Sequence, residues 1–184
     1  MNEFTDTNMG NYFELYEMPV SFHPDAAAVK QKFYALSKQF HPDRFAQAEE
    51  STKAEALQKA AMNNEAFKIL GDPDKTMAYI LRINHLLEEE EKYNLPPEFL
   101  MEMMELNEAV SDYEDDPDNT LFKNQAEQEL SAQLDSWNNE LAPLLSEFEK
   151  EGSGKDILIK IKDFYFRKKY LLRIRERLTT FASR

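Results

Sequence analysis

The feature that most constrains the fold is a helical periodicity that runs through most of the chain. In residues 25–40 the apolar side chains recur at spacings of four, three and four residues (Val29, Phe33, Leu36 and Phe40), which corresponds to one face of a 3.6-residue helix. Similar segments rich in Ala, Leu, Glu, Lys and Gln follow, whereas Gly, Val and Ile are sparse. The sequence therefore predicts an all-α protein.

A proline ends the helix that is expected over residues 25–40. Pro42 disfavours the α conformation at His41, fixes its own φ and lacks a backbone donor. The result is a stiff, polar corner that presents the imidazole of His41 together with the carboxylate of Asp43. Such a corner suits a recognition signal better than a core, and an ordinary helix stop and turn is the alternative interpretation.

The same tripeptide also occurs earlier, at His23-Pro24-Asp25, and provides an internal comparison. That copy precedes a helix instead of following one. Pro24 suits a first helical turn, and Asp25 near a helix N-terminus complements the macrodipole. We therefore expect the first copy to be a helix start, so the three letters alone do not identify a binding loop.

Composition excludes several classes of protein. A chain of 184 residues forms one large or two small domains, and the absence of Cys excludes disulfides and thiolate-bound metals. We expect no cofactor and no metal site. No apolar run reaches membrane-spanning length, and the first ten residues are too acidic and polar for a secretory signal, so a soluble cytoplasmic protein is expected. The net charge of −13 argues against nucleic-acid binding.

The charge is distributed unevenly along the chain. Residues 1–87 hold nine Lys and Arg against twelve Asp and Glu, residues 88–151 hold three against twenty, and residues 155–184 hold ten against three. An acidic middle followed by a basic final helix suggests two segments that pack antiparallel and partly neutralise each other. Solvated helix faces with uneven charge are the alternative explanation.

Breaks in the periodicity divide the chain into helices. The expected helices are 11–18, 25–40, 53–70, 73–87, 97–113, 119–149 and 155–182. In the third of these, Leu57, Ala60, Ala61, Asn64 and Phe67 form a small-residue face that could approach the basic helix closely. The acidic run and paired prolines of residues 88–96 indicate a linker, and Gly152-Ser153-Gly154 indicates a turn. Three long helices with short connections beyond the linker predict an antiparallel bundle.

The first half of the chain resembles a J domain, in which two antiparallel helices display a His-Pro-Asp loop at one end. The matching residues are Val29, Lys30, Phe33, Leu36, Phe40, His41, Pro42, Asp43, Arg44, Asn64, Ala66, Phe67, Leu70, Asp72, Pro73 and Tyr79. The resemblance covers residues 11–87 and leaves residues 1–10 as an N-terminal tail. The helices on both sides of the loop make it far more specific than the tripeptide.

The second half, residues 97–184, sharpens the resemblance. The chain has no Gly/Phe-rich linker and no CxxCxGxG repeats, so it is unlike the general DnaJ type. A J domain followed directly by a three-helix bundle resembles the HscB family, the dedicated co-chaperones of iron–sulfur cluster assembly. The segment from Phe99 to Leu106 (FLMEMMEL) resembles the FLME…LE signature of that family.

The resemblance implies a co-chaperone that hydrolyses nothing itself and has no catalytic residue. It would stimulate the ATPase of a DnaK/HscA-type chaperone. The chaperone contact would be made by His41, Pro42, Asp43, Lys30, Lys32, Lys38 and Arg44. The cations would attract an acidic surface of the chaperone, and such attraction mainly raises the rate at which the two proteins encounter each other.

The resemblance also implies that the bundle holds a client, the iron–sulfur scaffold protein IscU. The scaffold contact would be made by Leu100, Met101, Met104, Glu105, Glu108 and Asp112, together with Tyr165 or Phe166 on the last helix. The Leu and Met residues in this stripe could equally belong to the core of any bundle, because methionine serves both purposes. Met104 and Asn107 depart from the residues that the family carries there.

Two other functions are possible interpretations of the sequence. A metal-dependent hydrolase would have to use His23, His41 and His85, but these lack HExxH or any other close ligand spacing. The closer alternative is a J-domain co-chaperone that recruits a general DnaK-type chaperone to a different client. The sequence discriminates weakly between this alternative and the IscU hypothesis.

Overall fold

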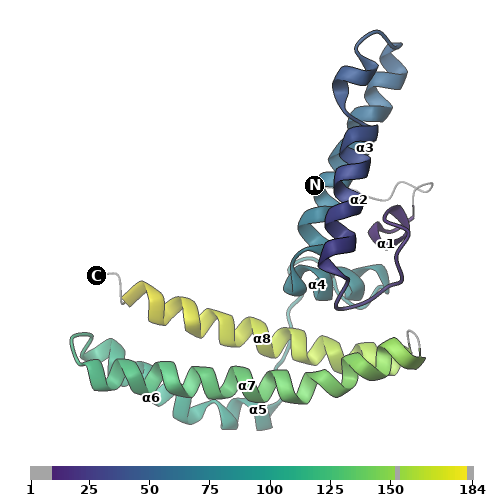
Figure 1. Cartoon of the computed structure of the whole chain (residues 1–184). Helices are drawn as coiled ribbons and strands as arrows, with labels where there is room; N and C mark the ends of the chain where they lie inside the picture. Colours follow the sequence, from purple (N-terminus) through teal and green to yellow (C-terminus); the bar gives the residue numbers. More distant parts are fainter. Residues whose placement is uncertain (1–9, 152–153, 182–184) are drawn as a thin grey trace. The chain divides into compact units, whose positions relative to one another are not determined.

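The computed structural model describes residues 10–151 and 154–181, and it divides the chain into two compact units, Met1–His85 and Leu86–Arg184. Every regular element in those residues is helical, which confirms the predicted all-α class (Figure 1). The expected tail up to residue 9 and the Gly152-Ser153 part of the expected turn lie outside the described residues.

The first unit is built around two antiparallel helices. Its elements are α1 (Tyr12–Leu15), α2 (Ala26–Gln39), the 3₁₀ helix η1 (Pro42–Phe45), α3 (Glu50–Leu70) and α4 (Pro73–Ile83). The ring of Phe33 in α2 stacks on Phe67 in α3 at 4.2 Å, and Lys59 lies 5.5 Å from the ring of Phe40. Residue numbers along α2 therefore increase in the direction in which those of α3 decrease, so the two helices are antiparallel. The 3₁₀ helix η1 lies at one end of the pair (Figure 1).

Side-chain caps determine where these helices begin. Asp25 accepts a hydrogen bond from the backbone N–H of Ala27 at 3.0 Å, which confirms the first His-Pro-Asp copy as a helix start. Asp72 caps α4 in the same way. Three expected boundaries were wrong. The helix α1 ends at Leu15 instead of residue 18, and α3 begins at Glu50 instead of residue 53. The helix α4 ends at Ile83 because His85 adopts a φ of 56° that no helix continues.

The face that α3 buries differs from the expected one. Leu57 is 64% exposed and Asn64 is exposed, whereas Ala56, Asn63 and Ala66 are buried. The expectation placed Leu57 and Asn64 on this face, whereas Phe67, which it also included, does pack, with its ring on that of Phe33. The tertiary structure buries Asn63 instead because it finds hydrogen-bond partners inside, so its burial carries little penalty.

Asn63 is the centre of a buried polar cluster that joins α2, α3 and the end of α1. Its Oδ1 accepts from the hydroxyl of Tyr16 at 2.9 Å, and its Nδ2 donates to Ser37 Oγ at 2.9 Å and to the carbonyl of Phe33 at 3.1 Å. Burial raises the pKa of Tyr16 to about 12. The cluster ties α3 both to α2, which carries the loop, and to the segment that follows α1.

The second unit is a helical bundle. Its helices are α5 (Pro97–Glu102), α6 (Met104–Asp115), α7 (Thr120–Glu151) and α8 (Lys155–Phe181). The helix expected over residues 97–113 is therefore two helices, because Met103 takes a turn conformation with φ −81° and ψ 1°. The long helices α7 and α8 lie side by side, and the indole N–H of Trp137 donates to the carbonyl of Phe164 at 2.8 Å (Figure 1).

Ion pairs join the acidic middle of the chain to the basic last helix. Arg177 in α8 binds both carboxylate oxygens of Glu114 in α6, at 3.0 and 2.8 Å, and Lys162 binds Glu91 at 2.5 Å. The expected neutralisation therefore occurs. The partner of α8 in the first pair is α6, which runs parallel to it, whereas the antiparallel neighbour is α7.

Candidate functional site

The second His-Pro-Asp copy forms an exposed corner at the end of α2. His41 is extended (φ −60°, ψ 130°), Pro42 opens η1, and the Nδ1 of His41 accepts from the backbone N–H of Asp43 at 3.3 Å. The side chains of His41 and Asp43 are 58% and 90% exposed, and Nδ1 lies 3.6 Å from the Asp43 carboxylate. Neither side chain serves a core, so both are presented to solvent.

A groove lies beside this corner. It has a volume of about 690 Å³ and is lined by Tyr34, Ser37, Lys38, His41 and Arg44. The guanidinium of Arg44 donates to the carbonyl of Lys38 at 3.3 Å, which satisfies one of the free carbonyls at the end of α2. An aromatic ring, a hydroxyl and two cationic side chains therefore meet the imidazole of His41 at this edge of the tripeptide.

The structure brings some of the expected chaperone-contact residues together and separates others. Lys38 and Arg44 lie with the tripeptide around the groove. Lys30 is exposed on α2 eight residues before Lys38, a separation of roughly 12 Å along the helix. Lys32 forms an ion pair with Glu17, which lowers the pKa of that carboxylate and partly neutralises the lysine.

In the bundle, the Leu and Met residues of the expected client surface face solvent. Leu100, Met101 and Met104 are 43%, 69% and 65% exposed. Phe99 and Met103, which alternate with them, are buried at 5% and 1%. The core interpretation therefore does not hold for the three exposed residues, and the break at Met103 helps to separate the two sets.

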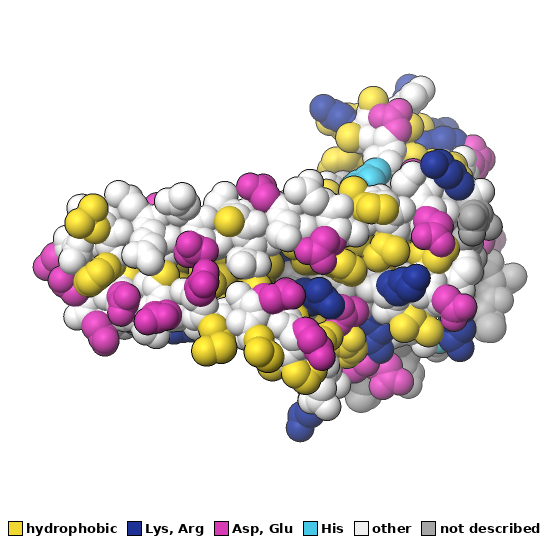
Figure 2. Space-filling model, turned by 90° about the horizontal axis from the view of Figure 1, so that it is seen from below, with side chains coloured by type: hydrophobic (Ala, Val, Ile, Leu, Met, Phe, Trp, Pro, Cys, Tyr) yellow, Lys and Arg dark blue, Asp and Glu magenta, His cyan; other side chains and the backbone are white. Residues whose placement is uncertain are grey.

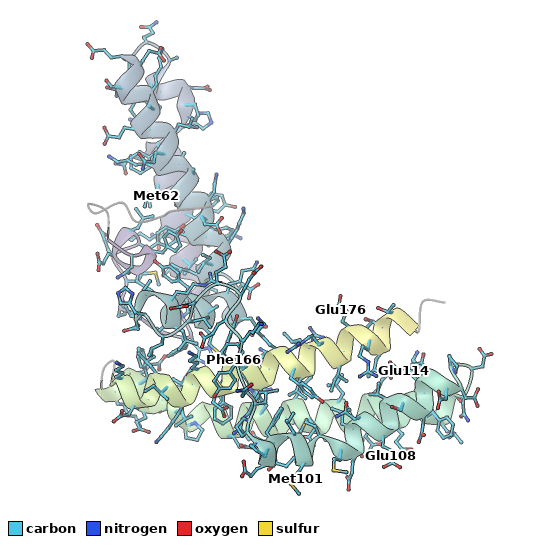
Figure 3. The ribbon with its side chains drawn as sticks, turned by 180° about the vertical axis from the view of Figure 1, so that it is seen from behind. Met62, Met101, Glu108, Glu114, Phe166 and Glu176 are labelled. Carbon is cyan, nitrogen blue, oxygen red and sulfur yellow. The ribbon has the colours of Figure 1, made fainter. Side chains whose placement is uncertain are left out.

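Acidic residues continue this surface along α6. Glu105, Glu108 and Asp112 are all exposed. Met101 on α5 and Glu108 on α6 point to the same side of the bundle, away from α8 (Figure 3). Hydrophobic and acidic side chains also adjoin on the face of the protein shown in Figure 2. We call the six exposed residues expected on α5 and α6 the α5–α6 surface.

The expected aromatic residue on α8 does not lie open beside that surface. Phe166 is 7% exposed, and its ring is stacked on that of Tyr93 at 4.3 Å with an interplanar angle of 3°. Tyr165 is partly exposed and meets Phe166 edge-on at 5.2 Å. Tyr93 belongs to the segment 88–96 that the sequence predicted as a linker, and this segment lies against α8.

Sequence reasoning missed a polar and aromatic network beneath α5. The hydroxyl of Tyr93 donates to Asp163 at 2.9 Å, and burial together with this bond raises the pKa of Tyr93 to about 12. Asp163 also pairs with Arg167 at 2.6 Å, and Arg167 lies over the ring of Phe99. The sequence signal for this network was the spacing of four residues between Asp163 and Arg167 on one helix. Pairs at this spacing usually lie on the surface, so the signal did not indicate a buried network.

The described residues hold neither a cluster suited to a metal ion nor a membrane-spanning helix. In residues 10–151 and 154–181, no group of three or more His, Cys, Asp or Glu side chains is arranged to hold a metal ion. No helix in that part of the chain is long and apolar enough to cross a membrane.

Comparisons with known proteins agree with the geometry. A family model described as the HSCB C-terminal oligomerisation domain matches residues 95–179. The co-chaperone protein HscB homologue of Photobacterium profundum is 36% identical over 155 residues, covering 83% of this chain and 89% of the relative. The homologue of Vibrio campbellii is 41% identical over 115 residues, covering 61% of this chain and 67% of the relative.

Solved structures give the same result. The structure of chaperone HscB from Vibrio cholerae has a TM-score of 0.60 and 31% identity, covering 92% of this chain and 99% of that one. Human co-chaperone protein HscB has a TM-score of 0.64, covers 90% of this chain and 82% of its own, and at 24% identity supports the fold alone. The chain therefore belongs to the HscB family, whose members are co-chaperones and not enzymes.

Proposed function

We propose that this protein is a cytoplasmic co-chaperone that delivers the scaffold protein IscU to a DnaK/HscA-type chaperone and stimulates the chaperone's ATPase, aiding iron–sulfur cluster assembly and transfer. A J domain over residues 11–87 would contact the chaperone, and a bundle over residues 97–184, joined to it by residues 88–96, would hold the client. The observation that carries the proposal is the exposed His41–Asp43 corner at the end of a basic helix, in a chain of the HscB family.

The chemistry of the corner fits an acidic and partly apolar chaperone surface. Lys38 and Arg44 supply positive potential at the groove, and Tyr34 supplies a ring that is 60% exposed. Exposed charges of this kind raise encounter rates and select partners, and salt screens them. The carboxylate of Asp43 is 90% exposed, so it is free to pair with a cation on the chaperone.

The test of the chaperone half is the steady-state ATPase of the partner chaperone. Asp43→Ala should abolish stimulation, because leaving one member of a desolvated charge pair without its partner costs about 2–5 kcal/mol. His41→Gln should do the same. The matched control is Asp25→Ala in the first tripeptide, which removes a helix cap and should leave stimulation nearly unchanged. Full stimulation by Asp43→Ala would refute the assignment.

The test of the client half is calorimetric binding of IscU. The double variant Leu100→Ala/Met104→Ala removes two exposed apolar side chains, so it should weaken binding while the bundle stays folded. Unchanged affinity would remove this surface from the proposal. A pull-down that compares IscU with an unrelated unfolded polypeptide separates the IscU hypothesis from a co-chaperone for a different client. Synergy between IscU and this protein in the ATPase assay is expected.

A further inference from the structure

The first turn of α5 is anchored by a cation held between two rings. The guanidinium carbon of Arg167 lies 5.2 Å from the ring centroid of Phe99 in α5 and 5.1 Å from that of Phe164 in α8. A planar guanidinium stacks flat on aromatic faces, whereas a lysine ammonium can make a cation–π contact but has no plane to stack. Phe99 is 5% exposed and also meets Tyr170 edge-on at 5.7 Å.

Arg167 forms an ion pair with its neighbour Asp163. The Nε of Arg167 lies 2.6 Å from one carboxylate oxygen of Asp163, and the two side chains are only 22% and 18% exposed. The other carboxylate oxygen accepts the hydroxyl of Tyr93 at 2.9 Å. One carboxylate therefore holds both the segment that leads into α5 and the cation that binds its Phe99.

The helix α5 needs such an anchor because it has only six residues. A helix this short is not stable by itself in water. The exposed residues Leu100 and Met101 directly follow Phe99, so the packing of Phe99 determines where they point. The anchor is on the inner side of α5 and the exposed residues are on its outer side.

We propose that Arg167 is a positioning residue for the α5–α6 surface. Its guanidinium, oriented by Asp163, holds Phe99 and thereby presents Leu100 and Met101 in the geometry that a client binds. This inference rests on the proposed function for the identity of the client. In this proposal Arg167 makes no direct contact with the client. A lysine at this position, which keeps the charge but not the planar guanidinium, should therefore not replace it.

The experiment compares three variants of the full chain: Arg167→Gln, Arg167→Lys and the control Arg173→Gln, which removes an exposed cation from the same helix. Two readouts are taken, calorimetric affinity for IscU and amide hydrogen exchange. The exchange readout follows the N–H groups of Leu100 and Met103, which bond to Pro96 and Phe99 at 3.1 Å.

We expect Arg167→Gln to weaken IscU binding about tenfold and to speed exchange in α5 about tenfold, the size expected for losing two cation–π contacts. Arg167→Lys should restore neither, because an ammonium has no plane to place between two rings. Exchange in α7 should not change, and Arg173→Gln should match the wild type. Rescue by Arg167→Lys would overturn the proposal, because it would show that charge suffices. Unchanged α5 exchange in Arg167→Gln would also overturn it.

The two readouts separate this inference from the proposed function. If the wild-type protein does not bind IscU, the proposed function fails, and the exchange measurement still tests the anchoring of α5. If Arg167→Gln unfolds the bundle, the milder Asp163→Asn variant keeps both rings and the guanidinium and is tested by the same readouts. Normal α5 exchange and normal IscU affinity in that variant would then refute the positioning role.

Discussion

The buried amide of Asn63 offers the sharpest test of what holds the first unit together. Asn63→Ala removes a side chain that is 1% exposed and three hydrogen bonds, to Tyr16, Ser37 and Phe33. At roughly 0.5–1.5 kcal/mol net for each bond, the expected loss of stability is about 3 kcal/mol. The hydroxyl of Tyr16 keeps one acceptor, the carbonyl of residue 63 at 3.1 Å, so it is not left without a partner.

The assay is urea unfolding of the full chain followed by two signals. Far-UV circular dichroism reports both units, whereas fluorescence of Trp137, the single tryptophan of the chain, reports the bundle. With an m-value of about 1 to 1.5 kcal/mol per molar urea, the midpoint of the first unit should fall by about 2 to 3 M. The fluorescence midpoint should not move.

The matched control is Asn64→Ala, at the next position of α3, where the side chain is exposed. A change there should alter stability by less than about 0.5 kcal/mol. Equal midpoints for Asn63→Ala and Asn64→Ala would refute the reasoning, because they would show that the buried hydrogen bonds contribute nothing net. An equal shift of the fluorescence midpoint would show that the two units do not unfold independently.

Three further outcomes are expected. Asp72→Ala should destabilise the first unit by about 1 kcal/mol in the same dichroism assay, because two backbone N–H groups of α4 lose their cap, and an unchanged midpoint would contradict this. Tyr93 has a pKa of about 12 in the fold against an ordinary value of 10.0, so the stability of the bundle should fall as the pH rises from about 10 to about 12. In urea unfolding followed by Trp137 fluorescence, Tyr93→Phe should make this fall less steep. An equally steep fall in the variant would count against the assignment. Glu114→Gln should cost at most about 1 kcal/mol of bundle stability, since its partner Arg177 is 45% exposed, and the difference should vanish in 1 M salt; a salt-independent loss would rule out the ion pair as its cause.

Much of the first unit could be predicted because its signals are local. The apolar spacing of residues 25–40 predicts α2, and Pro42 and Asp25 mark its two ends through backbone sterics and capping. The exposure of the His41 corner follows from the same local rules. The packed face of α3 could not be predicted in this way, because the burial of Asn63 depends on partners in α2 and near α1.

The candidate client surface was predicted less completely. The residues expected between Leu100 and Asp112 are exposed, which the sequence left open for the apolar ones because they could have belonged to the core. The break at Met103 was not expected, since Met is a good helix former and no Gly or Pro occupies the position. Of the two candidate aromatics on α8, Phe166 is covered by Tyr93 in a non-helical segment, whereas Tyr165 is partly exposed.

By itself, the sequence determined the all-α class, the helix carrying the exposed His41 corner and the acidic stripe that follows Leu100, because periodicity and proline sterics act over a few residues. The tertiary structure alone decided that Asn63 lies inside, that Tyr93 covers Phe166 and that Arg167 anchors Phe99. Each of these is a contact between residues far apart in the chain. Such contacts depend on how elements pack, which helical periodicity does not encode.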